Sequence, residues 1–230
     1  MLDSKFWARY FKVYDVLNLL IPYQELLETI CDELEIKPGE KILEAGCGTG
    51  NLAIKIKERG GEVIGLDNCK EALDIYQKKD STAKIVLADL REKLPFPNNY
   101  FDKIASNNTL YIIPKEKQLD TLKELYRVLK PGGKIVIANP LKEHKVFKIY
   151  IEGIKKNLKK EGLTTTIKKV LQFFIPTLKI FYYNFFISKI EFFPSPQELK
   201  SLLADAGFTT LSNGKLVYAN QSILIVGKKL

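Results

Sequence analysis

Cysteine and histidine are scarce in this 230-residue sequence, and their scarcity excludes several kinds of site. The three cysteines, Cys31, Cys47 and Cys69, are odd in number and far apart, so they form neither a disulfide framework nor a C-x-x-C metal site. We therefore expect no metal, and a reduced, cytosolic compartment is the simplest interpretation. The first residues contain charges and no apolar run, which argues against a signal peptide.

Acidic residues are scarce in one segment. The whole chain has a net charge of +9, while residues 141–190 hold eleven lysines and three glutamates, a net charge of +8. The remainder is therefore almost neutral. A basic balance confined to one segment predicts a local partner surface and not a generally basic protein.

Strand and helix patterns alternate through the first two thirds of the chain. The predicted strands are 41–44, 62–66, 84–87, 100–106 and 134–138. Helices are predicted before residue 36 and then at 51–59, 70–78 and 115–129. This alternation implies a parallel sheet with helices on both faces. A helix that starts at Ser195 comes next, followed by two strands, 209–218 and 222–228, which we expect to be antiparallel.

A glycine-rich turn follows the first strand, with the sequence E-A-G-C-G-T-G from Glu44 to Gly50. Glycine takes positive φ without strain and lets a ligand approach the backbone. The next helix points its free N–H groups at the same loop, where open α/β sheets bind nucleotides. The dinucleotide fingerprint G-x-G-x-x-G fails, because Asn51 stands at its third glycine.

Carboxylates end the next two strands. Asp67 comes 17 residues after Gly50 and can accept both hydroxyls of a ribose. Asp89 ends the third strand and is followed by Leu90. Each aspartate also has a simpler interpretation. Asp67, like Asn68, precedes a helix and could be its N-cap, and Asp89 could cap a loop.

As a set, these residues resemble the class I S-adenosylmethionine (SAM) dependent methyltransferases. The segment F-D-K-I-A-S-N-N, residues 101–108, resembles the fourth strand of that family and its exit. The segment R-V-L-K-P-G-G, residues 127–133, resembles the turn before its fifth strand. The resemblance implies an α/β fold with a doubly wound, mostly parallel seven-stranded sheet, an antiparallel final strand, N-terminal helices and a helical lid insertion. It divides a single domain, 1–230, into a helical cap (1–38), a SAM-binding core (39–140 and 191–230) and a basic, aromatic lid (141–190).

The resemblance also implies that SAM is the cofactor. It places Asp67 at the ribose, Asp89 at the adenine amino group with Leu90 against the ring, and Glu44 near the methionine amino group. An acid buried at that position needs a partner, which the amino group or the loop N–H groups would supply. The cofactor residues implied in this way are Glu44, Ala45, Gly46, Cys47, Gly48, Gly50, Asp67, Asn68, Asp89, Leu90 and Asn107.

For methyl transfer from SAM the protein mainly has to bring the two reactants together and orient them, because the sulfonium already makes the methyl group electrophilic. A general base is needed only if the acceptor must lose a proton. The candidates for that role are Tyr14, Asp15, Tyr111 and His144, and the sequence does not choose among them. His144 is the only histidine, just beyond the fifth strand.

The segment Y-D-V-L-N, which begins at Tyr14, resembles the Y-D-x-x-N opening of quinone-biosynthesis and phospholipid methyltransferases. This resemblance implies a small-molecule or lipid-like acceptor. The histidine and tryptophan that the quinone group carries further on are absent, and Asn139 stands where that group has an acid.

The lid joins a lysine-rich stretch, 155–160, to an aromatic-rich stretch, 170–187. A transmembrane helix is disfavoured, because Pro176 and Lys179 lie centrally and a lysine in mid-bilayer costs about 2.5–3.5 kcal/mol. Two alternatives remain open: aromatics that face the acceptor pocket, or aromatics at a lipid boundary with lysines on anionic head groups. A nucleic-acid partner ranks lower, because the chain has N-N-T-L from Asn107 where many nucleic-acid methyltransferases have N-P-P-[YF].

The sequence thus predicts transfer of a methyl group from SAM to a small, hydrophobic or lipid-like acceptor, in the cytoplasm or at the periphery of an anionic membrane. The alternatives are a tRNA or rRNA methyltransferase that uses the basic lid, and a non-catalytic SAM-binding protein of the same fold. The oligomeric state stays undetermined at this level.

Overall fold

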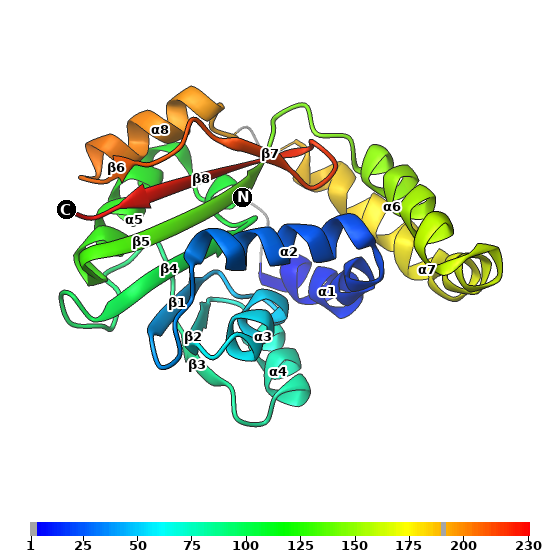
Figure 1. Cartoon of the computed structure of the whole chain (residues 1–230), viewed down its shortest axis with the longest axis horizontal. Helices are drawn as coiled ribbons and strands as arrows, with labels where there is room; N and C mark the ends of the chain where they lie inside the picture. Colours follow the sequence, from blue (N-terminus) through cyan, green and yellow to red (C-terminus); the bar gives the residue numbers. More distant parts are fainter. Residues whose placement is uncertain (1–3, 190–191) are drawn as a thin grey trace.

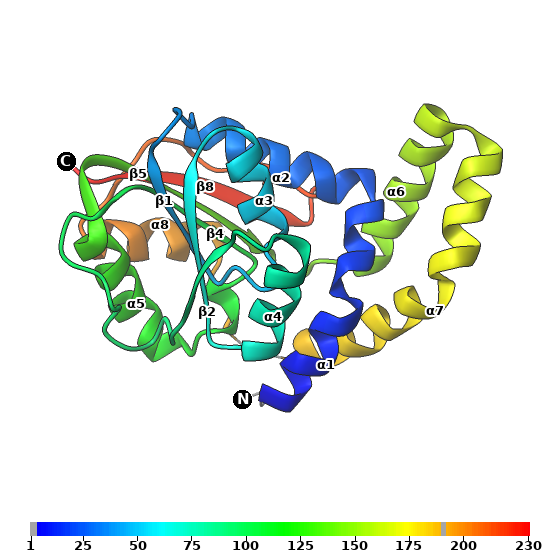
Figure 2. The ribbon, with the colours of Figure 1, turned by 90° about the horizontal axis from the view of Figure 1, so that it is seen from below.

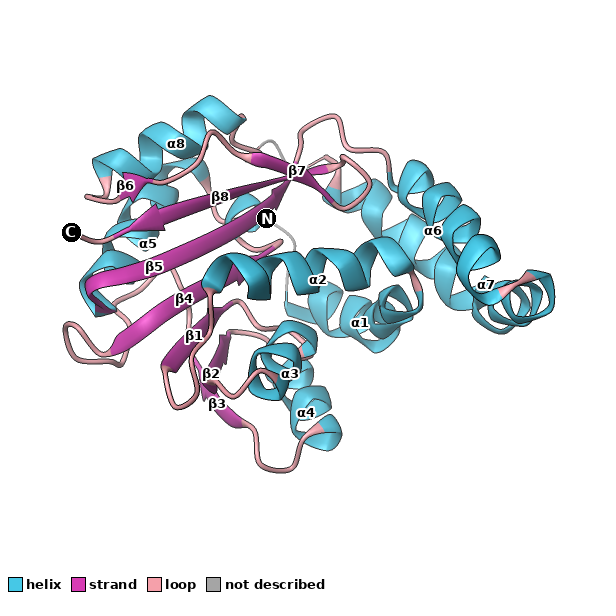
Figure 3. Ribbon diagram, viewed as in Figure 1, coloured by secondary structure: helices cyan, strands magenta, loops and turns pink. Residues whose placement is uncertain are grey.

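The centre of the structure, a computed structural model, is one mixed β-sheet with helices on both faces (Figure 1, Figure 3). The structure describes residues 4–189 and 192–230. The strands in this part of the chain are β1 (Lys41–Ala45), β2 (Glu62–Asp67), β3 (Lys84–Leu87), β4 (Phe101–Asn107), β5 (Leu129–Pro140), β6 (Thr209–Thr210), β7 (Lys215–Val217) and β8 (Ser222–Lys228).

The strand order is β3-β2-β1-β4-β5-β8-β6, with β7 also paired to β8. Strands β1 to β5 are parallel, and β8 runs antiparallel to β5. All of β1 except Lys41 is buried, as expected for a central strand covered on both faces. The predicted doubly wound, mostly parallel fold with an antiparallel final strand is confirmed.

Helices cover the two faces of the sheet and extend beyond one end of it. They are α1 (Ser4–Tyr14), the 3₁₀ helix η1 (Asp15–Leu19), α2 (Ile21–Leu34), α3 (Asn51–Glu58), α4 (Lys70–Lys79), the 3₁₀ helix η2 (Leu110–Ile112), α5 (Lys115–Val128), α6 (Val146–Glu161), α7 (Leu163–Ile187) and α8 (Pro196–Asp205). One apolar cluster joins α2, α3 and α4 to the sheet, and a second cluster joins α5 and α8 to its other face.

The C-terminal strands differ from the prediction in one respect. The segment 209–218 is two short strands, β6 and β7, because the intervening turn contains Gly214 at φ +92°. Both pieces pair antiparallel with β8, as predicted. The sheet therefore has eight strands in the described residues instead of seven. Strand β5 also starts earlier than predicted, at Leu129, directly after α5.

The helices α6 and α7 lie side by side beyond the sheet, next to α1 and α2 (Figure 1, Figure 2). Aromatic contacts join α1 to α7, since the rings of Phe6 and Tyr10 lie 5.2 and 5.8 Å from that of Tyr183. Among the described residues no single helix could span a membrane, although the two halves of α7, bent by 61°, meet the length and composition criteria together. The predicted end of the lid, at residues 190 and 191, lies outside the described residues.

Candidate functional site

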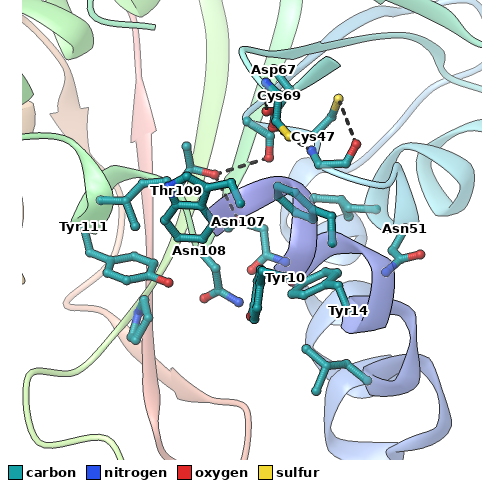
Figure 4. Close-up of a pocket in the computed structure, with 18 of the residues that line it drawn as sticks. Tyr10, Tyr14, Cys47, Asn51, Asp67, Cys69, Asn107, Asn108, Thr109 and Tyr111 are labelled. Carbon is teal, nitrogen blue, oxygen red and sulfur yellow. Dashed lines mark hydrogen bonds between the residues drawn. The ribbon is translucent and has the colours of Figure 1, made fainter. Parts of the chain in front are cut away.

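A cavity of about 450 Å³ lies between the carboxyl ends of the central strands, α1 and the helices α6 and α7. One end of the cavity is polar, with Asp67 and Cys47 from the strand-end loops (Figure 4). The other end is aromatic, with Tyr10 and Tyr14 from α1 and Tyr111 after β4. The carboxyl ends of parallel strands meet at one edge of a sheet, and this is the usual ligand site of such folds.

Nine of the eleven predicted cofactor residues line the cavity: Glu44, Gly46, Cys47, Gly48, Asp67, Asn68, Asp89, Leu90 and Asn107. Ala45 and Gly50 do not. Ala45 is fully buried in the apolar cluster under α5 and α8, on the opposite face of the sheet. Gly50 begins α3 at φ +74° and faces the buried ring of Tyr76.

Asp67 connects the glycine loop to the start of α4. Its Oδ2 accepts a hydrogen bond from Gly48 N at 2.8 Å, and its Oδ1 accepts one from Cys69 N at 2.9 Å. Burial raises the pKa of the Asp67 carboxyl above its ordinary value, and the two N–H groups oppose that rise. Each carboxylate oxygen keeps a further lone pair, so the side chain can also accept the hydroxyls of a ribose.

Asp89 is paired with a residue that the sequence did not single out. Its carboxylate accepts from the backbone N and the Nε of Arg91, both at 2.9 Å. The Arg91 guanidinium holds the pKa of the Asp89 carboxyl below its ordinary value. Arg91 also lines the cavity, which adds a planar cation beside Asp89 and Leu90 at this end.

Glu44 is a buried carboxyl of the site with one oxygen unpartnered in the part of the chain that the structure describes. The residue is 3% exposed, and its Oε2 has no hydrogen-bond partner among the described residues. Burial raises the pKa of the Glu44 carboxyl well above its ordinary value, opposed by the Ala53 N–H. A buried carboxyl oxygen without a partner, on the wall of a cavity, suits a ligand that brings a cationic amino group.

The glycine loop is covered by the N-terminal helix. A Cβ on Gly48, which has φ +49°, would lie 2.7 Å from the ring of Phe11 in α1. The Thr49 hydroxyl donates to Asp15 Oδ1 at 2.6 Å, and Lys79 pairs with the same carboxylate at 3.0 Å. Asp15 is therefore engaged by the loop and by α4 and does not line the cavity, in contrast to the other candidate bases.

The three remaining candidates for acid–base chemistry, Tyr14, Tyr111 and His144, all line the cavity. Burial raises the pKa of Tyr14 to about 12 and raises that of Tyr111 as well. Burial also lowers the pKa of His144. The His144 Nδ1 lies 2.8 Å from the Leu141 carbonyl, which can only accept, so Nδ1 carries the proton and Nε2 is the free acceptor in the neutral ring.

Tyr218 is a wall residue that the sequence analysis did not single out. Tyr218, Ala219 and Asn220 have consecutive positive φ angles of 53, 55 and 60°, and this turn brings the Tyr218 ring within 5.8 Å of the Tyr23 ring. None of these three residues is a glycine, so nothing in the local sequence indicates a turn with positive φ angles. The rings of α1 recur at helical spacing in the sequence, and the structure shows which of them border the cavity.

Sequence comparison with known proteins finds similarity to methyltransferases over part of the chain. Residues 42–133 match the family model described as a methyltransferase domain. A demethylmenaquinone methyltransferase of Geobacillus sp. is 32% identical over 56% of this chain and 59% of its own length. One of Thermus thermophilus is 29% identical over 85% of this chain and 88% of its own. The chain spans only about half to three fifths of the length of most curated relatives that it matches most strongly.

Comparison by structure supports the fold. The crystal structure of a SAM-dependent methyltransferase from Aquifex aeolicus superposes over all of both chains with a TM-score of 0.66 and 18% identity. The site also suits the cofactor: Asp67 has acceptors for a ribose, residues 46–48 of the glycine loop line the cavity, and the Glu44 oxygen lacks a partner. Residues 42–133 thus match a methyltransferase domain, the whole chain has the fold of a SAM-dependent methyltransferase, and the cavity holds groups that suit this cofactor.

Proposed function

We propose that this protein transfers the methyl group of SAM to a small, hydrophobic or lipid-like acceptor. The observation that carries the proposal is the continuity of one cavity from the polar strand ends to an apolar wall. That wall includes Ile149 of α6 and Ile180 of α7, both almost fully buried, and the rings of α1. The relatives named demethylmenaquinone methyltransferase make a quinone acceptor the first to test.

When bound, SAM supplies an electrophilic methyl group on its sulfonium, and the protein binds and orients the reactants. Asp67 would accept hydrogen bonds from the ribose hydroxyls, and Asp89 with Leu90 would hold the adenine. Glu44 would pair with the methionine amino group. The aromatic walls exclude water and orient an apolar acceptor toward the polar end of the cavity.

The protonation states of the cavity side chains suggest their roles. The raised pKa values of Tyr14 and Tyr111 keep both phenols protonated near neutral pH, so they can donate hydrogen bonds to an acceptor oxygen. His144 stays neutral with Nε2 unprotonated, which suits it to take a proton from the acceptor. We therefore assign the base to His144 for an acceptor that must lose a proton.

Removing the Asp67 carboxylate should weaken cofactor binding. We expect Asp67→Ala to cost roughly 1–3 kcal/mol, about 5- to 150-fold in the Kd for SAM or S-adenosylhomocysteine, because charge-assisted hydrogen bonds are lost. Titration calorimetry measures this change. Asp74→Ala, which removes a partly exposed carboxylate of α4 that pairs with Lys70 outside the cavity, is the matched control. An unchanged Kd for Asp67→Ala would reduce Asp67 to a capping residue.

A methyl-transfer screen with radiolabelled SAM tests the activity itself. The acceptors are a lipid extract that contains quinones, a soluble metabolite pool and tRNA. We expect label in the lipid extract or among apolar metabolites. Label only in tRNA would favour the nucleic-acid alternative, and SAM binding without transfer to any pool would favour a non-catalytic binding protein. Failure to bind SAM at millimolar concentration would overturn the proposal.

A further inference from the structure

The helices α6 and α7 expose an unusual amount of apolar surface. Of the sixteen large hydrophobic residues that are exposed in the described part of the chain, twelve belong to these two helices. None of these twelve residues belongs to the buried clusters on the two faces of the sheet. An apolar surface concentrated in this way marks an interaction site.

The exposed residues line up along each helix. Those of α7 follow one another at helical spacing on each side of its bend: Leu163, Ile167, Val170 and Leu171 before the bend, and Phe174, Ile175, Leu178, Tyr182 and Phe185 after it. Those of α6 are Phe147, Ile154 and Leu158, separated by seven and four residues. Spacings of three, four and seven place residues on one side of a helix. We call these two rows the outer lid face.

Lysines border the outer lid face. On α6 each exposed apolar residue is followed directly by an exposed lysine, giving Lys148, Lys155 and Lys159. At the end of α7 the exposed Lys189 lies 4.3 Å from the ring centroid of Phe185. Only two acidic residues occur in these helices, and one of them, Glu161, is already paired with Lys169. The face is therefore apolar along its rows and cationic at its margin.

The opposite side of the same helices belongs to the cavity. Val146 and Ile149 of α6 and Ile180 and Asn184 of α7 line it. Ile149 and Ile180 are 4% and 0% exposed, in contrast to 73% for Leu171 on the outer side. The lid helices thus lie between the cavity and whatever covers the outer lid face.

We propose that the outer lid face docks on an anionic lipid bilayer, with its apolar rows in the interfacial region and its lysines on the head groups. Amphipathic helices with basic margins bind at such interfaces, in the plane of the membrane. A second copy of the chain fits poorly, because each face would bring the same cationic margin to the contact. Nucleic acid fits poorly as well, because the α7 row is mostly aliphatic. The proposal rests on the proposed function only in that a lipid-like acceptor would then enter the cavity from the bilayer.

Co-sedimentation of the full chain with vesicles tests the proposal. Vesicles of phosphatidylcholine alone are compared with vesicles that also contain phosphatidylglycerol, over a salt series. We expect binding to the anionic vesicles at low salt that weakens as salt is raised. The double variant Lys155→Gln with Lys159→Gln should bind about 30-fold more weakly, at about fivefold per lysine. Lys156 stays unchanged in this variant, because it pairs with Glu25 of α2.

A control variant distinguishes an effect of the outer lid face from an effect of the net charge of the protein. Lys78→Gln with Lys117→Gln removes two exposed lysines from α4 and α5 and should leave vesicle binding unchanged. Leu171→Gln with Ile175→Gln changes two exposed residues, so the fold should persist while binding to anionic vesicles falls at least tenfold. Absence of binding to anionic vesicles at low salt, equal losses in the control, or a self-association that the lid variants abolish would each overturn the proposal.

The two proposals fail in distinguishable ways. Vesicle binding needs neither SAM nor turnover, so it remains measurable if no methyl transfer is found. Methyl transfer to an acceptor dissolved in detergent should be the same in the lid variants and in the wild type, because the changed side chains do not line the cavity. A loss of transfer in detergent would show that the outer lid face serves the site directly and would overturn its role as a docking surface.

Discussion

Replacing Gly50 by alanine is expected to lower the free energy of unfolding by about 2–5 kcal/mol. Gly50 has φ +74°, a conformation that costs an L-residue roughly 1–2 kcal/mol. The new Cβ would also overlap the ring of Tyr76, which is fully buried and cannot move aside freely. Overpacking of a close-packed core adds about 1–3 kcal/mol.

A second glycine isolates the steric part of this effect. Gly132 has a similar φ of +79°, and a Cβ there would meet no atom within 4 Å. Gly132→Ala should therefore lose only the backbone contribution, about 1–2 kcal/mol. Urea unfolding of both variants gives the comparison. Equal losses would show that Tyr76 does not restrict position 50, and that Gly50 is required for its backbone conformation alone.

The fold and much of the site could be predicted because their signals are local. A strand that ends in glycines or a carboxylate needs no knowledge of the rest of the chain to be recognised, and the parallel sheet then brings these ends together. The helix start at Ser195 is equally local: Ser195 Oγ accepts from Glu198 N, and Glu198 Oε2 accepts from Ser195 N. Both bonds follow from a four-residue pattern.

The parts that could not be predicted depend on contacts between distant residues. Asp15 was a candidate base by composition, but its partner is Thr49, 34 residues away. Gly50 belongs to the glycine motif, and only the packing of α4 shows that it faces Tyr76 and not the cavity. The charge and the aromatic content of the lid can be counted in the sequence. The side of α7 that is exposed, however, depends on how that helix packs against α1 and α6.

The stability of the protein without cofactor is expected to fall as pH rises, through Glu44. The pKa of this carboxyl in the folded protein lies well above its ordinary value of 4.5 because the group is buried. Between the two pKa values the folded state holds a proton that the unfolded state has released. The contribution of Glu44 is thus complete below about pH 4.5 and is lost as pH rises toward the folded pKa, at about 1.4 kcal/mol per pH unit.

Glu44→Gln should remove this slope, because an amide does not titrate. Denaturant unfolding is measured from pH 5 to pH 8. The free energy of unfolding of the variant should increase relative to that of the wild type as pH rises. Glu116→Gln, which changes an exposed glutamate at the start of α5, provides the matched control and should follow the wild type. Other groups that titrate in this range contribute equally to the wild type and the variant, so the difference between the two proteins isolates Glu44.

Cofactor binding should reverse the protonation of the same group. A cationic amino group beside Glu44 favours its carboxylate, so binding of SAM should release a proton and the affinity of the wild type should rise with pH. Calorimetry in two buffers with different ionisation enthalpies measures that proton. The Glu44→Gln variant should bind more weakly and show neither the proton release nor the pH dependence. Parallel pH profiles for the two proteins would mean that the amino group of SAM does not reach Glu44, and that the buried carboxyl serves the apo fold alone.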